Sequence, residues 1–130
     1  MTKEYFFSLI SKLDALRFAP TEERILEIYF ERLNNLQEDI FKETIEYILD
    51  NQNEFPTITE IRGKYYEIRE ARYKFCKRCD KYCPKHTHEC FVYEDLLILK
   101  KYSPLEFKEK MSNLVYKQIF QKFGGRNEQN

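Results

Sequence analysis

One stretch decides how the middle of this chain folds: CKRCDKYCPKHTHEC, from Cys76 to Cys90. It contains all four cysteines and both histidines of the 130 residues. Zinc binds four sulfur or nitrogen ligands in a tetrahedron, and Cys76 and Cys79, two residues apart, can offer two thiolates from one tight turn. A second pair of ligands would close the site. The stretch therefore predicts a metal centre, with structural zinc as the preferred metal.

Six side chains compete for four positions, and spacing alone does not choose among them. The preferred set has four thiolates, because thiolates usually bind when they are available and histidines can remain around them as hydrogen-bond donors. An alternative set replaces Cys83 with His86, and His88 could take the place of His86. An iron–sulfur cluster on the four thiolates is the less favoured cofactor, and free cysteines or disulfides would leave the stretch without a metal. The preferred ligands are Cys76, Cys79, Cys83 and Cys90, with His86 and His88 as alternates.

A structural role for the metal is favoured over catalysis. A catalytic zinc keeps an open coordination position with a general base nearby; Glu89 is adjacent in sequence, but the surplus of ligands favours a closed site. The chain has no phosphate-binding Gly-x4-Gly-Lys loop, and its four serines have no histidine outside the metal stretch to activate them. We therefore expect a non-enzymatic protein without a small-molecule substrate.

Helical periodicity precedes the metal stretch. Apolar residues recur every three or four positions in four segments, which predicts four amphipathic helices. Thr21 is expected to cap the second helix, and Thr57 or Thr59 the fourth, after Pro56 has forced extended backbone on the residue before it. The predicted helices cover Thr2 to Phe18, Ile25 to Leu36, Ile40 to Leu49 and Ile61 to Arg72.

Further helices are predicted after the metal stretch. Tyr93 to Leu99 forms a short one, and Ser103-Pro104-Leu105-Glu106 starts another, with Ser103 as the cap of a capping box. Apolar residues in steps of four carry this last helix to Phe123. Gly124 and Gly125 are expected to end it, because glycine enters the left-handed cap conformation without strain.

These segments predict an all-α fold: a small helical bundle with an inserted zinc-knuckle-like segment and a long C-terminal helix. A two-stranded ribbon around the cysteines is the alternative for the inserted segment. The expected domains are a helical N-terminal domain at 1–75, the metal-binding segment at 76–91, C-terminal helices at 92–123 and a disordered tail at 124–130.

Formal charge is zero overall but unevenly distributed. Met1 to Glu60 carries −7, Ile61 to Cys90 carries +5 and the remainder carries +2. Cations mixed with aromatic residues near a zinc knuckle are typical of single-stranded nucleic-acid binding, whereas a solvated helix with inward tyrosines is the alternative. One functional hypothesis is therefore a zinc-containing nucleic-acid-binding regulator. Its predicted nucleic-acid or partner surface consists of Arg62, Arg69, Arg72, Tyr73, Lys74, Lys77 and Arg78.

Nothing in the sequence predicts a membrane association. The longest aliphatic run, Leu96 to Leu99, is far too short to span a bilayer, and the charged N-terminal residues do not form a signal peptide. We expect a soluble, cytoplasmic protein without a membrane partner, in the host cytoplasm if the chain is phage-encoded.

A short motif gives a second functional hypothesis. Phe55-Pro56-Thr57-Ile58-Thr59-Glu60-Ile61-Arg62 resembles the end of the helical domain in phage replicative-helicase loader/inhibitor proteins, where Pro-Thr-x-x-Glu-Ile-Arg follows two amphipathic helices. The resemblance covers about residues 1–75. It implies a small helical protein that binds the hexameric replicative helicase and delivers it to phage origins through an initiator protein.

The C-terminal part differs from that family, in which it is largely flexible. Here it contains the metal stretch and a helix with clear start signals. The leading hypothesis is a replication adaptor that binds a replicative helicase or another replisome protein, with single-stranded DNA as a further candidate partner.

Overall fold

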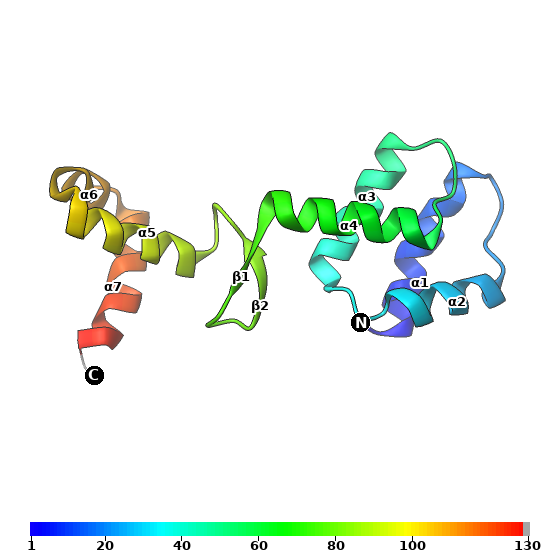
Figure 1. Cartoon of the computed structure of the whole chain (residues 1–130), viewed down its shortest axis with the longest axis horizontal. Coiled ribbons are helices and arrows are strands. Elements are labelled where there is room, and N and C mark those ends of the chain that lie inside the picture. Colours follow the sequence, from blue (N-terminus) through cyan, green and yellow to red (C-terminus); the bar gives the residue numbers. More distant parts are fainter. Residues whose placement is uncertain (129–130) are drawn as a thin grey trace. The chain divides into compact units, whose positions relative to one another are not determined.

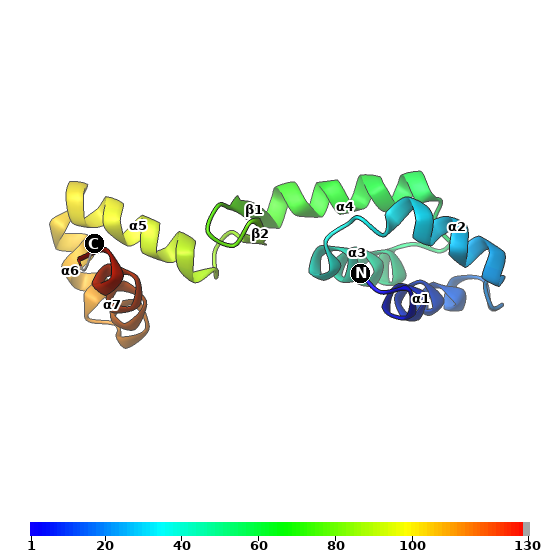
Figure 2. The ribbon, with the colours of Figure 1, turned by 90° about the horizontal axis from the view of Figure 1, so that it is seen from below.

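The computed structural model describes residues 1–128, with side chains up to Gly124. The chain divides into two compact units, Met1–Arg72 and Tyr73–Asn130. The first is helical, and the second begins with a two-stranded ribbon that is followed by helices (Figures 1 and 2). The expectation of a mostly helical protein is confirmed. The ribbon, which the sequence left as an alternative for the cysteine segment, is present.

The N-terminal unit consists of four α-helices and one 3-10 turn. The turn, Leu13–Leu16, follows α1, so the predicted first helix is regular only to Lys12. The other bounds are α1 (Lys3–Lys12), α2 (Glu23–Leu33), α3 (Glu38–Asn51) and α4 (Ile58–Arg72). Helix α3 packs against α1 and α4, and α2 packs against α1 and α4.

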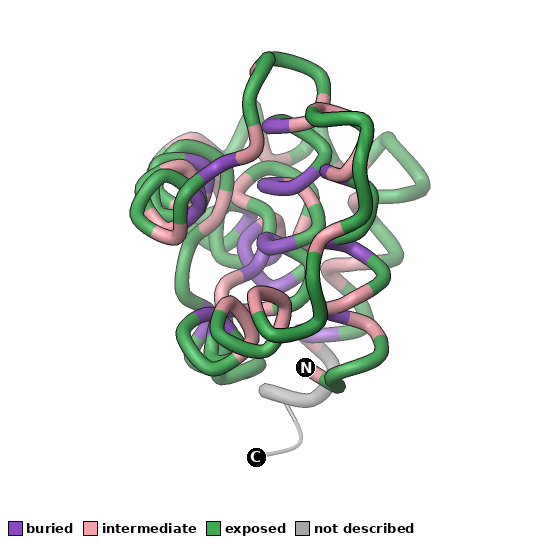
Figure 3. Tube along the Cα trace, turned by 90° about the vertical axis from the view of Figure 1, so that its right-hand side faces the viewer, coloured by how far each residue is buried: buried purple, intermediate pink, exposed green. Residues whose placement is uncertain are grey.

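A core of aliphatic and aromatic side chains holds this unit together. Phe6 is fully buried, its ring stacks on Phe41 at a centroid distance of 5.3 Å, and it meets the edge of Phe30 at 5.4 Å. Figure 3 marks the buried positions along the chain. The residues buried in this unit include Phe6, Leu9, Ile10, Leu13, Leu33, Leu36, Ile40, Phe41, Ile45, Ile48, Ile61, Tyr65 and Ile68.

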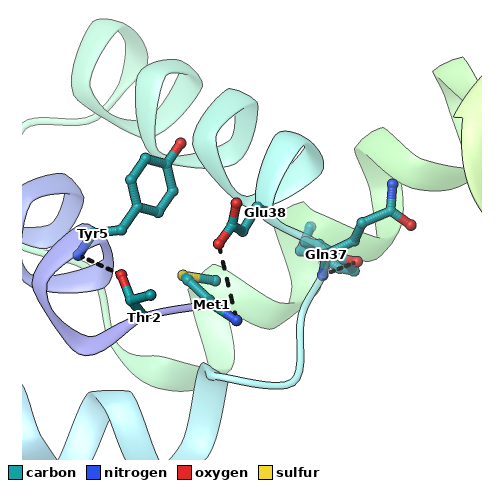
Figure 4. Close-up of polar contacts among 6 residues, drawn as sticks. Met1, Thr2, Tyr5, Gln37 and Glu38 are labelled. Atoms are coloured by element: carbon teal, nitrogen blue, oxygen red, sulfur yellow. Dashed lines mark hydrogen bonds and ion pairs between the residues drawn. The ribbon is translucent and has the colours of Figure 1, made fainter.

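Side-chain hydrogen bonds fix where several of these helices begin. The Thr2 hydroxyl accepts the Tyr5 backbone N–H at 3.2 Å and caps α1 (Figure 4). The Tyr65 hydroxyl accepts the Gln37 N–H at 2.9 Å at the start of α3. The predicted cap at Thr21 is wrong. Glu22 is the N-cap of α2, and its side chain makes no capping hydrogen bond. The Thr21 hydroxyl donates to the Asp14 carboxylate and accepts from the Arg17 guanidinium instead of capping the helix.

The segment that carries the family resemblance forms the start of α4. The Thr57 hydroxyl accepts the Glu60 N–H, and the Glu60 carboxylate accepts the Thr57 N–H, both at 3.1 Å. This reciprocal pair is a capping box, so Thr57 rather than Thr59 caps the helix. The carbonyl of buried Pro56 accepts the Tyr29 hydroxyl at 2.9 Å.

The C-terminal unit contains β1 (Tyr73–Cys76), β2 (Lys81–Pro84), α5 (Glu89–Tyr102), α6 (Pro104–Met111) and α7 (Leu114–Glu128). Helix α5 packs against both α6 and α7. The ribbon belongs to the same compact unit as these helices. Three of the four cysteines, Cys76, Cys83 and Cys90, lie in one apolar cluster with Phe91, Tyr93 and Phe123.

The predicted long C-terminal helix is wrong, because two helices replace it. The chain turns at Ser112 and Asn113, and the Asn113 side chain accepts the Val115 N–H at 2.9 Å at the start of α7. Asparagine favours such local bonds over a helix interior.

The other predicted limits of this helix also differ from the structure. Helix α6 starts at Pro104, but Ser103 makes no side-chain cap. Helix α7 continues through Gly124 and Gly125, so the expected glycine stop is also wrong. Of the tail predicted at 124–130, the last two residues lie outside the described part.

Replacing Thr57 with alanine should lower the free energy of unfolding of the full chain by about 1 kcal/mol, because the hydroxyl that closes the capping box is lost. Chemical denaturation followed by circular dichroism measures this change. Thr59→Ala is the matched control, since it removes a threonine hydroxyl two residues later, within α4, where alanine has the higher helix propensity. Equal losses from both substitutions would contradict the assignment of Thr57 as the cap.

Candidate metal centre

The ribbon brings the first three cysteines together. Its antiparallel register pairs Cys76 with Lys81 and Lys74 with Cys83, so both cysteines lie on the same face of the two strands. Between the strands, the Asp80 N–H donates to the Cys76 carbonyl at 2.8 Å, and Asp80 adopts a left-handed conformation with φ of 56°. Aspartate is one of the few residues besides glycine that tolerates this conformation. The turn therefore carries Cys79 back towards Cys76.

The remaining candidates follow a second turn. The His88 N–H donates to the Pro84 carbonyl at 3.2 Å, and His88 is the N-cap of α5. Cys90 lies in the first turn of that helix. The possible ligands therefore come from the end of β1, from the turn between the strands, from β2, and from the segment between β2 and the first turn of α5.

Four ligand atoms form a compact set. The sulfur atoms of Cys76, Cys79 and Cys83 and an imidazole nitrogen of His88 all lie within 4.8 Å of one another. The Cys79 sulfur is 3.4 Å from His88 Nε2. In a tetrahedron with zinc–sulfur bonds of about 2.3 Å, ligand sulfurs are separated by roughly 3.8 Å, so only a small contraction would close these residues around an ion. The four residues could bind a metal.

The two residues on which the ligand choice depends, Cys90 and His86, are placed differently. The Cys90 thiol is buried and interacts with the thiols of Cys76 and Cys79. His86 instead lines a separate cavity of about 120 Å³ together with Lys110 and Tyr116. The structure thus brings His88 into the compact set and keeps Cys90 beside it. The four-thiolate set stays a prediction, with His88 as the rival ligand.

The thiols differ in how readily they ionise. Burial alone would raise the pKa of Cys76, but hydrogen bonds from the Cys79 backbone, from the His88 side chain and from the Arg78 backbone outweigh it and lower that pKa to about 7. Burial raises the pKa of Cys83 to about 11, and the neighbouring Cys79 thiol adds to the effect. Burial and the Cys76 thiol likewise raise the pKa of Cys90 to about 11. Donors that converge on the Cys76 sulfur stabilise a thiolate, the form that binds metal.

The surroundings of the cluster are apolar on one side and open on the other. Cys76, Cys83 and Cys90 are covered by Phe91, Tyr93 and Phe123, whereas Cys79 is exposed. Glu89, the one carboxylate that the sequence placed beside the metal stretch as a base, pairs with Lys122 at 2.8 Å. The arrangement suits a metal that links the ribbon to α5.

The predicted nucleic-acid surface is divided between the two units. In the N-terminal unit, Arg62 donates to the Arg32 carbonyl at 2.8 Å, Arg69 pairs with Glu70 at 2.9 Å and Arg72 pairs with Glu43. The other four residues, Tyr73, Lys74, Lys77 and Arg78, belong to the ribbon unit. Phe75 was not among the predicted surface residues, although the period-two alternation of a ribbon would have placed it opposite the buried cysteines.

No known protein family, curated protein or solved structure matches this chain. Within residues 1–128, every helix is too short or too polar to cross a membrane.

Elemental analysis of the purified full-length protein should find one metal ion per chain, and we expect zinc. Cys76→Ser, which removes the sulfur with the most converging donors, should lose the metal and lower the melting temperature. His86→Ala is the matched control, because His86 lies outside the compact set. A metal-free protein with unchanged stability in Cys76→Ser would contradict the site.

Zinc binding at pH 7 should release protons, because Cys83, with a pKa near 11, must lose its proton to become a ligand. Zinc affinity should therefore rise as the pH increases above 7. Calorimetric titrations in buffers of different ionisation enthalpy measure the number of protons released. A Cys90→Ser variant should release fewer protons if Cys90 is a ligand and the same number if His88 completes the site. An affinity independent of pH would contradict thiolate ligation.

Proposed function

We propose that this chain is a non-enzymatic replication adaptor. Its N-terminal unit binds a replicative helicase or another replisome protein, and its C-terminal unit is held together by a structural zinc ion. The proposal combines the resemblance at Phe55 to Arg62 with the gathering of Cys76, Cys79, Cys83 and His88. The cysteine and histidine cluster is the observation that supports the zinc site, and the motif is the observation that supports the choice of partner.

Five of the eight residues of the resemblance motif have a structural role within the N-terminal unit. The Pro56 carbonyl accepts the Tyr29 hydroxyl, Thr57 and Glu60 cap α4, and Ile61 is fully buried. Arg62 donates to the carbonyl of Arg32 near the end of α2, where helical carbonyls lack internal partners. These residues therefore join α4 to α2.

The charge distribution supports two different partners. Residues 1–72 contain ten basic and fifteen acidic side chains, a net charge of −5, and residues 73–130 contain twelve basic and seven acidic ones, a net charge of +5. The two units therefore carry net charges of opposite sign. The local electric field decides which ligands a surface attracts. The acidic unit therefore suits a basic partner surface, and the basic unit suits an acidic one.

A closed zinc site suits an adaptor better than an enzyme. Its ligand candidates outnumber the four positions of the metal, and the Glu89 carboxylate forms an ion pair with Lys122. The zinc would stabilise the C-terminal unit by fixing the ribbon to the first turn of α5. Most iron–sulfur clusters are bound by thiolates alone, whereas zinc accepts either four thiolates or a mixed set that includes His88, whose Nε2 lies 3.4 Å from the Cys79 sulfur.

The full-length protein should bind purified replicative helicase of the same replication system in size-exclusion chromatography. Phe6→Ala, which removes a ring from the N-terminal core and should cost about 3–5 kcal/mol, is expected to abolish binding. Phe123→Ala is the matched control, because it removes a buried ring from the C-terminal unit only. Circular dichroism reports how far each variant remains folded.

Two results would contradict the proposal. One is that the folded wild-type protein does not bind the helicase. The other is that Phe123→Ala abolishes binding while Phe6→Ala retains it, since the contact would then lie in the C-terminal unit.

A further inference from the structure

A cavity of about 260 Å³ lies between the ribbon and the start of α5. Most of its lining comes from the ribbon and its turn, and two residues, Phe91 and Glu94, come from α5. The full lining consists of Lys74, Phe75, Cys76, Lys77, Arg78, Phe91 and Glu94. The lining therefore contains three cations, two aromatic rings and one carboxylate, and the cavity is large enough for one nucleotide.

Two of the three cations of this cavity lie over aromatic rings. The Lys74 ammonium lies 5.2 Å from the centre of the Phe91 ring. The Arg78 guanidinium lies 5.3 Å from the Phe123 ring and 5.7 Å from the Tyr93 ring. Contacts with aromatic faces orient a cation and leave its charge uncompensated. Within the described residues, no carboxylate forms an ion pair with Lys74, Lys77 or Arg78, in contrast to the paired Arg69 and Arg72 of α4.

An exposed ring lines the same cavity as these cations. Phe75 is 45% exposed, and its ring packs edge-on against Tyr82, its cross-strand partner, at a centroid distance of 5.6 Å. The neighbouring positions Cys76 and Cys83 are buried on the opposite face of the ribbon. Phe75 is thus supported by a strand whose other face is fixed by the cysteine cluster, which makes it a pre-positioned stacking surface.

We propose that this cavity and the exposed face of Phe75 bind single-stranded nucleic acid. Lys74, Lys77 and Arg78 contact the phosphates, and a base stacks on Phe75. A base can stack on Phe75 only when it is not stacked within a duplex, so the site fits a single strand and not a duplex. Every base offers a π-face, so the strand can be of mixed sequence. The inference goes beyond the proposed function, because the helicase contact is assigned to the N-terminal unit.

The charge of the ribbon supports this occupant. Residues 73–85 contain five basic side chains and one acidic one. A zinc ion with three thiolates adds a formal charge of −1, and one with four thiolates adds −2, so the ribbon stays positive with either ligand set. The cavity is therefore complementary to a polyanion while the metal is bound.

Fluorescence anisotropy of a labelled 15-nucleotide single strand, titrated with the zinc-loaded full-length protein, tests the proposal. Phe75→Ala should weaken binding about tenfold, the loss typical of one stacked base, and Phe75→Tyr should restore it. Lys77→Gln should weaken binding and reduce the slope of log affinity against log salt by about 0.7, the value for one phosphate contact on a single strand.

Matched controls separate this site from general charge and hydrophobicity. Phe18→Ala removes a ring that is 96% exposed in the N-terminal unit, and Lys108→Gln removes an exposed cation from α6. Neither should change the affinity. Zinc content and circular dichroism establish that each variant is folded, and Lys77→Gln, whose side chain is exposed, keeps the test valid if Phe75→Ala does not fold.

Three results would overturn the inference. They are no binding of the single strand at low salt, equal effects of the cavity variants and the controls, and binding of a duplex of the same sequence as tight as that of the single strand. Helicase binding is measured in a separate experiment. A failure of single-strand binding can therefore be distinguished from a failure of helicase binding.

Discussion

The convergence of cysteine sulfurs beneath Tyr93 and Phe123 is the interaction on which the C-terminal unit depends. Half of the buried residues in its apolar cluster are cysteines, namely Cys76, Cys83 and Cys90. A unit of fewer than sixty residues has little apolar surface to bury, and such units are usually stabilised by a metal or by disulfides. A metal at this point would connect the ribbon to α5, and the packing of α5 on α6 and α7 would extend that stability to the helices.

The N-terminal unit is stabilised differently. Its interior is a continuous set of aliphatic and aromatic side chains around Phe6 and Phe41, and its helix starts are fixed by Thr2, Tyr65 and Thr57. The two units therefore differ in their interiors: the acidic unit has a core of aliphatic and aromatic side chains, and the basic unit gathers three cysteines among aromatic rings.

Local chemistry explains which parts of the fold could be predicted. Apolar periodicity located the helices, and Thr57 could be predicted as one of two candidate caps because its partner Glu60 lies only three residues away in the sequence. Thr21 failed as a cap because Asp14, seven residues earlier, accepts its hydroxyl, and periodicity contains no information on that contact. The break at Asn113 interrupts an apolar repeat that continues across it, so the repeat alone predicted one helix where two form.

The metal centre was predictable as a cluster, because its candidates are close in sequence, but its fourth ligand was not. That choice depends on where α5 begins. With His88 as the N-cap and Cys90 in the first turn, both side chains reach the cluster, while His86 lies outside it. Either ligand would attach the same helix end to the ribbon, so the fold of the unit does not depend on which one binds.

The choice of the fourth ligand would change the charge of the unit. With zinc bound, four thiolates would leave the net charge of the unit at +3, and three thiolates with His88 would leave it at +4, beside Lys77 and Arg78. The ligand choice therefore sets how strongly the ribbon attracts an anion, while the packing around Tyr93 and Phe123 sets its shape.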